Sequence, residues 1–277
     1  MICLRLTGNI YFARIRVNHY KLIVAYDGTD YAGWQSQGNG KSVAEALCRS
    51  FESVFRVQPF LHGVSRTDAG VHAVGQVVWL KADLDLDPDQ LKFAWNNRID
   101  RSIVIRSVQA VSREYRSMQE VIEKTYFYHF FTSRPLPFLA RYGWYCDHRL
   151  DLDKLRGALQ IFVGTHDFRS YCTGDEWEDT VRTINSIELV TLPKIQMYRI
   201  VVKGPRFLRY MIRRIVGSCI QVASHSKMEI GYLKKVLDEL DPEQCLRNAP
   251  SRGLMLYRIK YLGDGFDDDK ETQINLF

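Results

Sequence analysis

Residues 20–26, YKLIVAY, form an apolar, β-branched run that ends at the turn pair Asp27–Gly28, and this pattern is typical of a β-strand. Residues 41–55 predict an amphipathic helix, because Ser42 and Glu45 match a capping box and apolar residues follow at helical spacing. The rest of this half predicts strands at 60–63 and 76–81, a helix at 88–97 and a strand at 103–111. The order β-α-β-β-α-β is that of a ferredoxin-like unit.

The second half of the chain predicts the same order again. Its expected elements are a strand at 125–131, a helix from the Asp151 cap to residue 162, strands at 180–190 and 194–204, a helix at 205–223 and a strand at 253–261. An additional helix at 226–240, with Ser226 and Glu229 as capping box, precedes the last strand. We therefore expect an α+β protein of two ferredoxin-like (βαββαβ) domains, residues 1–114 and 115–277, with an acidic tail from about residue 263.

The composition is that of an ordinary folded protein. Of the 277 residues, 46% are hydrophobic and 25% are charged, so we expect neither a disordered chain nor a membrane span. The formal net charge of +6 permits a nucleic-acid partner without requiring one. Arg5, Arg14 and Arg16 interrupt the first apolar runs, which predicts that no signal peptide is present. Six cysteines occur without a CxxC pair, so we expect no metal site and a cytoplasmic setting.

The strongest helical pattern with basic residues is PRFLRYMIRRIVGSCI, residues 205–220. Its apolar residues form a continuous stripe, which is typical of a helix that packs on a sheet. On the other side, Arg206, Arg209 and Arg213 fall within about 60° of arc at roughly 100° per residue, with Arg214 nearby. Two interpretations stay open: a solvated helix face, or cations that take RNA phosphates or a buried carboxylate.

A polar loop, SRTDAGVHA at residues 65–73, is expected between two strands of the first unit. Asp68 is its one carboxylate and is flanked by Arg66 and His72. An Asp-Ala-Gly stretch is most often only a turn. A carboxylate held by backbone amides and a cation would instead stay ionised and oriented, as a nucleophile requires. Tyr126, in the aromatic strand, is open to a similar choice between a core residue and a ligand contact.

Seven stretches, taken in chain order, resemble motifs of the tRNA pseudouridine synthase A family: YDGTDYAGWQSQGN, SRTDAGVHAVGQV, EKTYFYHF, GTHDFRSYC, VRTI, FLRYMIRRIVG and APSRGLML. The resemblance covers residues 20–262. It implies an isomerase that acts on tRNA and converts uridine to pseudouridine at positions 38, 39 and 40 of the anticodon stem-loop, without metal or organic cofactor. It also implies a homodimer, and two ferredoxin-like domains whose sheets join across a central catalytic cleft.

The resemblance assigns roles to individual residues in a reaction that flips the base, cleaves its glycosidic bond, turns it and joins C5 to C1′. Asp68 matches the catalytic aspartate, and Arg213 matches the arginine that pairs with it. Tyr126 matches the aromatic that stacks on the uracil and assists loss of the C5 proton, and Arg66 matches the arginine associated with base flipping. We expect phosphate contacts from three further arginines: Arg206, Arg209 and Arg214.

The chain departs from the family pattern in several places. Ser65 stands where the family usually has Gly, EYRSMQE at 114–120 replaces a stretch with a His-Ala pair, and Arg214 follows Arg213 as an extra charge. The first 18 residues precede the common family start. The alternatives are a pseudouridine synthase with a different RNA target and a non-catalytic RNA-binding module. The chain lacks the Lys/Arg-Gly-Phe signature of sheet-surface RNA-binding modules, which disfavours the latter.

Overall fold

A computed structural model describes residues 18–35, 41–115, 121–173 and 179–262 of the chain. The segment before residue 18, most of EYRSMQE and the acidic tail from residue 263 lie outside the described residues. The first half contains β1 (Asn18–Tyr26), α1 (Val43–Phe55), β2 (Phe60–Gly63), β3 (His72–Ala82), α2 (Pro88–Asn96) and β4 (Ile103–Val111). The second half contains β5 (Val121–Phe131), β6 (Trp144–Tyr145), α3 (Leu152–Gln160), β7 (Gly164–Asp167), β8 (Val181–Ile184), β9 (Ser186–Leu192), β10 (Met197–Gly204), α4 (Met211–Ser224), α5 (Gly231–Glu239) and β11 (Leu254–Tyr261).

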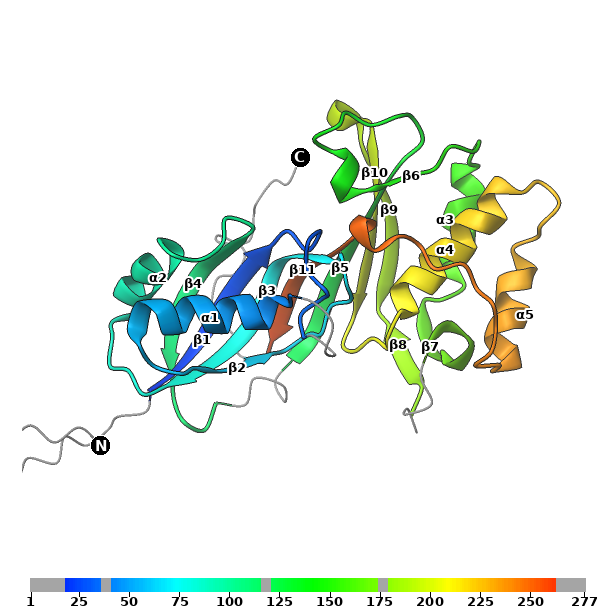
Figure 1. Cartoon of the computed structure of the whole chain (residues 1–277). Coiled ribbons are helices and arrows are strands. Elements are labelled where there is room, and N and C mark those ends of the chain that lie inside the picture. Colours follow the sequence, from blue (N-terminus) through cyan, green and yellow to red (C-terminus); the bar gives the residue numbers. More distant parts are fainter. Residues whose placement is uncertain (1–17, 36–40, 116–120, 174–178, 263–277) are drawn as a thin grey trace, which may run out of the picture.

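Most of these strands belong to one large mixed sheet. Within the described ranges it has nine strands in the order β4-β1-β3-β11-β5-β10-β9, with β2 beside β3 and β6 beside β5. β3 and β11 pair in parallel, His72 with Met255 and Ala73 with Leu256. The two halves of the chain therefore share one continuous sheet (Figure 1), and the predicted α+β class is confirmed.

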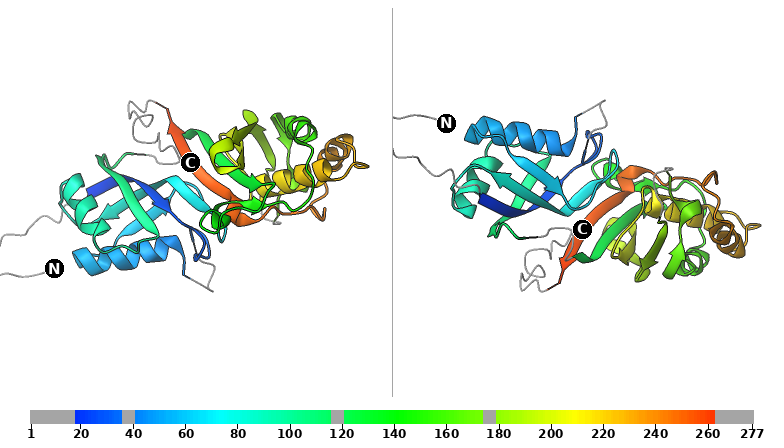
Figure 2. Two further views of the ribbon diagram at one scale, coloured as in Figure 1. Left: turned by 90° about the horizontal axis from the view of Figure 1, so that it is seen from above. Right: turned by 90° about the horizontal axis from the view of Figure 1, so that it is seen from below.

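The helices pack against the sheet through the apolar stripes that their sequences predict. α1 begins at the predicted capping box, in which the Ser42 hydroxyl accepts from the Glu45 amide at 3.2 Å and the Glu45 carboxylate accepts from the Ser42 amide at 3.3 Å. Phe51 of α1 is fully buried and meets the Trp95 ring of α2 edge-on at 4.9 Å. Figure 2 shows the two halves side by side, each with its helices against its own part of the sheet. The junction of β3 and β11 lies between them.

Two strand predictions need correction. β3 begins at His72 rather than at 76, because its first residues pair with β11, a partner that is distant in sequence. The expected strand at 180–190 is two strands that separate at Asn185. β8 pairs with β7 in a separate two-stranded sheet, whereas β9 pairs with β10 in the large sheet. The apolar pattern alone does not distinguish these two partners.

The start of α4 differs from the predicted start at residue 205. Tyr210 adopts a left-handed backbone conformation with φ 61°, and regular helix begins only at Met211. A non-glycine residue in this conformation interrupts a right-handed helix. Arg206 and Arg209 therefore lie in the segment before α4, and the expected helical arc that joins them to Arg213 is wrong.

The helix before the last strand also begins later than expected. α5 begins at Gly231, and its N-cap residue, Ile230, provides no side-chain cap. The predicted capping box of Ser226 and Glu229 is therefore wrong. The other predicted elements lie at or within a few residues of their expected positions. In the part of the chain that the structure describes, no helix is long and apolar enough to cross a membrane.

Candidate active site

The loop that follows β2, residues 64–71, lies where the two halves of the sheet meet. It leads directly into His72, the first residue of β3 and one of the residues that pair with β11. From the second half, the first turn of α4 reaches the loop through Arg213. The loop that carries Asp68 is thus placed at the junction by strand pairing on one side and by a helix on the other.

Contacts with the segment after β1 hold this loop in place. The Trp34 amide donates to the Thr67 carbonyl at 3.0 Å, and the Tyr26 hydroxyl is 2.8 Å from the Thr67 hydroxyl. Gly33 approaches so closely that an added Cβ would lie 2.6 Å from the Thr67 carbonyl oxygen, and its φ of +98° also favours glycine. The residue before Asp68 is therefore fixed in both its backbone and its side chain.

Asp68 and Arg213, which are 145 residues apart, form an ion pair. Arg213 Nη1 donates to Asp68 Oδ2 at 3.1 Å. The Arg213 side chain is 15% exposed and the Asp68 side chain is 22% exposed. Arg213 Nε donates to the Ala249 carbonyl at 2.8 Å, and the guanidinium lies 5.1 Å from the centre of the Tyr210 ring. These contacts orient the guanidinium towards the carboxylate. Within the described residues, the carboxylate accepts a hydrogen bond from Arg213 rather than from a backbone amide.

The environment of Asp68 makes its carboxylate more basic than an exposed aspartate. Burial raises the pKa above its usual value, and the hydrogen bond and charge of Arg213, with the charge of Arg209, only partly offset this effect. The arrangement keeps a partly desolvated carboxylate beside a fixed cation. Such a group can act as a nucleophile or a base.

Tyr126 of β5 lies on the same side of the junction. It is 6% exposed, its hydroxyl is 2.8 Å from the Ser65 hydroxyl, and its ring meets Phe207 edge-on at 5.4 Å. Burial raises the pKa of Tyr126 to about 12, the hydrogen bond from Ser65 opposes this, and the charge of Asp68 adds to it. The structure thus brings Asp68, Arg213 and Tyr126 into one region.

Two residues of this region carry contacts that sequence reasoning missed. Ser65, noted only as a departure from the family pattern, is buried and contacts both Tyr126 and Lys124. Lys124 Nζ donates to the Ser65 hydroxyl at 3.2 Å and to the Val64 carbonyl at 3.0 Å. The two-residue spacing of Lys124 and Tyr126 places both side chains on one face of β5. This two-residue spacing in the sequence could have identified Lys124 as a neighbour of Tyr126.

Three of the predicted arginines are exposed around this region. Arg66 lies in the Asp68 loop, and Arg206 and Arg209 lie in the segment before α4. The guanidinium of Arg209 lies 5.0 Å from the Tyr210 ring centre, and its charge acts on Asp68. Because these side chains are exposed, they can contact an anionic ligand.

Arg214 is placed differently from the prediction. It is 9% exposed, and its Nη1 donates to the carbonyls of Ser170 at 3.2 Å and Cys172 at 2.7 Å. Because successive residues on a helix are rotated by about 100°, Arg214 points inward while Arg213 faces the loop. The structure therefore places the Arg214 side chain in the interior, which disfavours the predicted phosphate contact.

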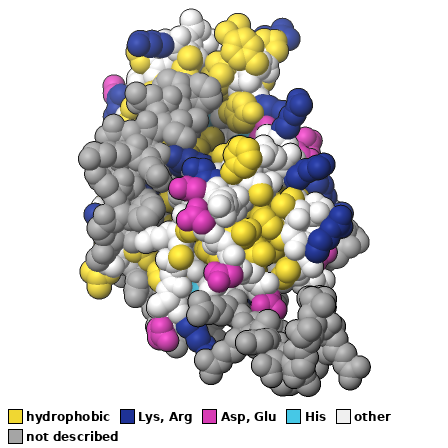
Figure 3. All heavy atoms as spheres, turned by 90° about the vertical axis from the view of Figure 1, so that its left-hand side faces the viewer, with side chains coloured by type: hydrophobic (Ala, Val, Ile, Leu, Met, Phe, Trp, Pro, Cys, Tyr) yellow, Lys and Arg dark blue, Asp and Glu magenta, His cyan; other side chains and the backbone are white. Residues whose placement is uncertain are grey.

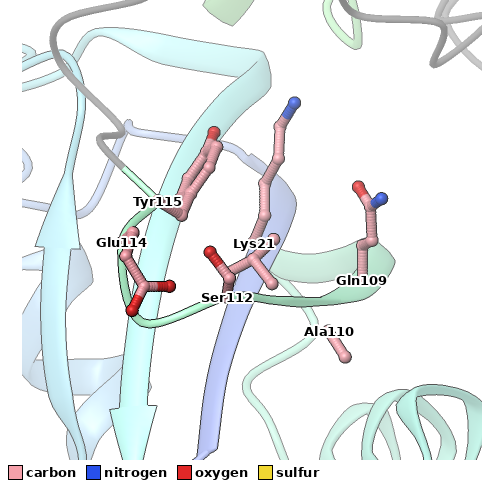
Figure 4. A pocket seen from close by; sticks show the side chains of 7 residues that line it. Lys21, Gln109, Ala110, Ser112, Glu114 and Tyr115 are labelled. Carbon is pink, nitrogen blue, oxygen red and sulfur yellow. The ribbon is translucent and has the colours of Figure 1, made fainter.

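A pocket of about 450 Å³ at the end of β4 is separate from this site. Figure 4 shows Lys21, Gln109 and Tyr115 among the residues that line it, and none of the predicted site residues takes part. In the described ranges, no group of three or more His, Cys, Asp or Glu side chains is placed to hold a metal ion. The contacts among Asp68, Arg213 and Tyr126 make the junction of the two halves the candidate active site.

Comparisons with known proteins show which proteins the chain is similar to. A family model described as tRNA pseudouridine synthase matches residues 158–262. The chain is 35% identical to "tRNA pseudouridine synthase A 1" of Protochlamydia amoebophila, over 87% of this chain and 96% of that protein. It is 34% identical to "tRNA pseudouridine synthase A" of Thermotoga neapolitana, over 86% and 98%. Among solved structures, a Cbf5-Nop10-Gar1 complex matches with a TM-score of 0.31 and 11% identity, over 73% of this chain and 54% of that chain.

Proposed function

The chain belongs to the tRNA pseudouridine synthase A family, and we propose that it modifies uridines 38, 39 and 40 of the tRNA anticodon stem-loop. The enzyme is an isomerase that converts uridine of the anticodon stem-loop to pseudouridine. The observation that carries the proposal is the ion pair of Asp68 and Arg213 at the junction of the two halves. It gives a basic carboxylate, held by a cation, beside an aromatic side chain.

The proposed reaction begins when the target uridine leaves the base stack, because its glycosidic bond cannot be reached inside a helix. Arg66 assists this step, and Tyr126 stacks on the extruded uracil. Asp68 initiates cleavage of the bond between N1 and C1′, and the freed uracil turns and joins C1′ through C5. The C5 proton is then lost with the help of Tyr126, and N1 gains a proton, so the product has the same atoms as the substrate. Arg213 keeps Asp68 oriented throughout.

The exposed position of the remaining arginines supports a role in RNA binding. The charge of Arg209 acts on Asp68 and that of Arg206 on Lys124, and both side chains are exposed and would contact phosphates of the stem-loop. Such contacts fix the position and orientation of the RNA rather than its sequence. The target uridine would then be selected by the shape of the tRNA and by which uridines can enter the active site.

We also propose that each half is a ferredoxin-like domain, with the boundary at residues 114 and 115 and the catalytic cleft between them. The strand order supports this, because each half places its fourth strand beside its first, then its third, then its second: β4-β1-β3-β2 and β11-β5-β10-β9. Family membership supports a homodimer, which light scattering of the purified protein would test. The cysteines that the structure describes are free thiols, in keeping with a cytoplasmic setting.

The experiment that tests the target is incubation of the purified enzyme with an unmodified tRNA transcript, followed by mapping of pseudouridine at each position. The proposal expects modification at positions 38, 39 and 40 and nowhere else. A transcript in which these uridines are replaced by cytidine is the matched control and should stay unmodified. Modification confined to other positions would assign the enzyme a different RNA target.

A further inference from the structure

Three side chains behind the candidate site form a continuous chain of hydrogen bonds. The Tyr126 hydroxyl is 2.8 Å from the Ser65 hydroxyl, and Lys124 Nζ is 3.2 Å from that same hydroxyl. Lys124 also donates to the Val64 carbonyl at 3.0 Å. Ser65 therefore connects the Tyr126 phenol at the site to the Lys124 amine.

The serine is held in place independently of this chain. Its amide donates to Gln76 Oε1 at 3.2 Å, and Gln76 Nε2 donates to its carbonyl at 2.5 Å. Gln76 comes from β3 and is fully buried. With the backbone held by Gln76 and the hydroxyl in contact with both Tyr126 and Lys124, Ser65 is placed for transfer between these two partners.

The surroundings of Lys124 make its amine a competent proton acceptor. Burial lowers the pKa of Lys124 to about 8, and the positive charge of Arg206 adds to this effect. The Tyr126 hydroxyl at the other end is acted on by the charge of Asp68. In this chain of hydrogen bonds, Arg206 is therefore the charged group that acts on Lys124, and Asp68 is the one that acts on Tyr126. The unprotonated fraction of Lys124 is therefore larger than that of an exposed lysine, and it increases as pH rises through about 8.

On the basis of the proposed function, we propose that Ser65 and Lys124 form a proton relay behind Tyr126 that receives the C5 proton of the rotated uracil. The Tyr126 oxygen takes the C5 proton while its own proton passes to Ser65 Oγ, and the Ser65 proton passes to the unprotonated Lys124 Nζ. The electron pair of the C5–H bond returns to the uracil ring, and N1 takes a proton from solvent. Lys124 ends the step as an ammonium and later releases its proton to solvent.

The test uses single-turnover reactions at saturating enzyme with tRNA whose target uridines carry either hydrogen or deuterium at C5. The variants are Ser65→Ala, Lys124→Met and Lys124→Arg, and the control is Lys235→Met, which removes an exposed amine of α5. The relay predicts C5 proton loss about 10²-fold slower in all three variants. This step then limits the rate, so a primary isotope effect larger than that of the wild type appears in all three. The control should match the wild type.

The Lys124→Arg variant separates proton transfer from structural support, because a guanidinium keeps the charge and the donors but cannot accept a proton. Wild-type rate and isotope effect in Lys124→Arg would overturn the relay. Equal slowing of both isotopic substrates would also overturn it, because a merely structural role slows every step. If Lys124→Met fails to fold, which circular dichroism would show, Ser65→Ala and Lys124→Arg still decide the outcome.

The pH dependence gives an independent readout. Only unprotonated Lys124 accepts, so C5 proton loss in the wild type should rise as pH increases through about 8 and then level off. This rise should be absent in Lys124→Arg, and its persistence there would count against the relay. Failure of the proposed function would look different, because the wild-type enzyme would then form no pseudouridine in the anticodon stem-loop.

Discussion

Burial and Arg213 shift the pKa of Asp68 in opposite directions. This opposition gives Arg213 a role in the proposed reaction. Burial alone would raise the pKa of the carboxyl and favour its neutral form, which is a poor nucleophile and a poor base. Arg213 donates to it at 3.1 Å and partly counteracts the burial. The result is a partly desolvated carboxyl group beside a fixed cation, and the cation favours the ionised form that the proposed reaction requires.

Replacement of Asp68 by Asn tests its role in the proposed reaction. Asp68→Asn keeps the size of the side chain but removes its charge, so folding and tRNA affinity should change little. Single-turnover pseudouridine formation should fall about thousandfold, which corresponds to about 4 kcal/mol of transition-state stabilisation. A folded Asp68→Asn enzyme that modifies tRNA at close to the wild-type rate would remove Asp68 from the mechanism.

Replacement of Arg213 should change the pH dependence as well as the rate. The proposed reaction requires ionised Asp68, so activity should be lost as pH falls through the pKa of this group. Arg213→Ala removes the main influence that lowers this pKa, so the acid limb of the rate profile should move to higher pH. Residual activity should therefore increase with pH over a range where the wild-type rate is constant. The check is a single-turnover pH profile of both enzymes, with Arg213→Lys as an intermediate case.

At the scale of elements, α4 shows what the sequence could and could not predict. The part of its predicted apolar stripe that lies in the helix is buried as expected: Met211, Ile212, Ile215, Val216, Cys219 and Ile220. Its start was not predicted, because Pro205 resembles a first helical residue and the left-handed conformation of Tyr210 has no local signature. Likewise, the division of 180–190 into two strands depends on partners distant in sequence. Local patterns predict elements better than their ends and partners.

The corrected start of α4 leads to a prediction about salt dependence. Arg206 and Arg209 lie on the exposed segment before the helix, so each should contribute about one unit to the slope of log affinity for tRNA against log salt concentration. Arg206→Ala and Arg209→Ala should each reduce this slope in a binding titration. An unchanged slope in both variants would assign these arginines to something other than phosphate contacts.

Arg214 provides the matched control for this titration, because it is the same residue type turned into the interior. Arg214→Ala leaves the carbonyls of Ser170 and Cys172 without their donor, which should lower the free energy of unfolding by about 1–3 kcal/mol. The salt slope should stay at its wild-type value. A reduced slope without loss of stability would restore Arg214 as an RNA contact.

At the scale of the whole molecule, net charge alone does not locate the site. The formal net charge is +6, yet Figure 3 shows acidic, basic and apolar side chains intermixed on the face at the outer end of the first half. The position of the site depends on the pairing of β3 with β11 and on a contact across 145 residues. Periodicity cannot predict such a contact, and here only the resemblance of motifs did.

The reaction as proposed needs a carboxylate, a cation and an aromatic side chain, and it therefore predicts activity without a metal ion. Pseudouridine formation should survive treatment with EDTA, provided that a polyamine keeps the tRNA folded. Single-turnover rates before and after chelation provide the measurement. Loss of activity that one transition metal restores, and polyamine does not, would contradict this prediction.

The two halves are also fastened at the junction by Asp27, which follows β1. Tyr142, from a short helical turn in the second half, donates to Asp27 Oδ2 at 2.9 Å, and Arg141 Nη1 lies 3.3 Å from the same oxygen. On the other side, His72 Nδ1 is 3.2 Å from Asp27 Oδ1. Burial raises the pKa of Asp27, but hydrogen bonds from His72, Thr29 and Tyr142 outweigh it, and the pKa lies well below its usual value.

Because the pKa of Asp27 is lowered, its hydrogen bond with Tyr142 should stabilise the folded protein at every pH where Asp27 is ionised. Tyr142→Phe removes one hydrogen bond to a charged group and should lower the free energy of unfolding by about 1.5–3 kcal/mol. Because Asp27 is ionised in both the folded and the unfolded protein well above pH 3.8, the difference from the wild type should be the same at pH 7 and pH 5. It should shrink only as Asp27 becomes protonated below that range. Urea unfolding at pH 7 and pH 5 measures this difference in the free energy of unfolding, with Tyr145→Phe as the control. A difference that disappears already at pH 5 would show that a group other than Asp27 is responsible.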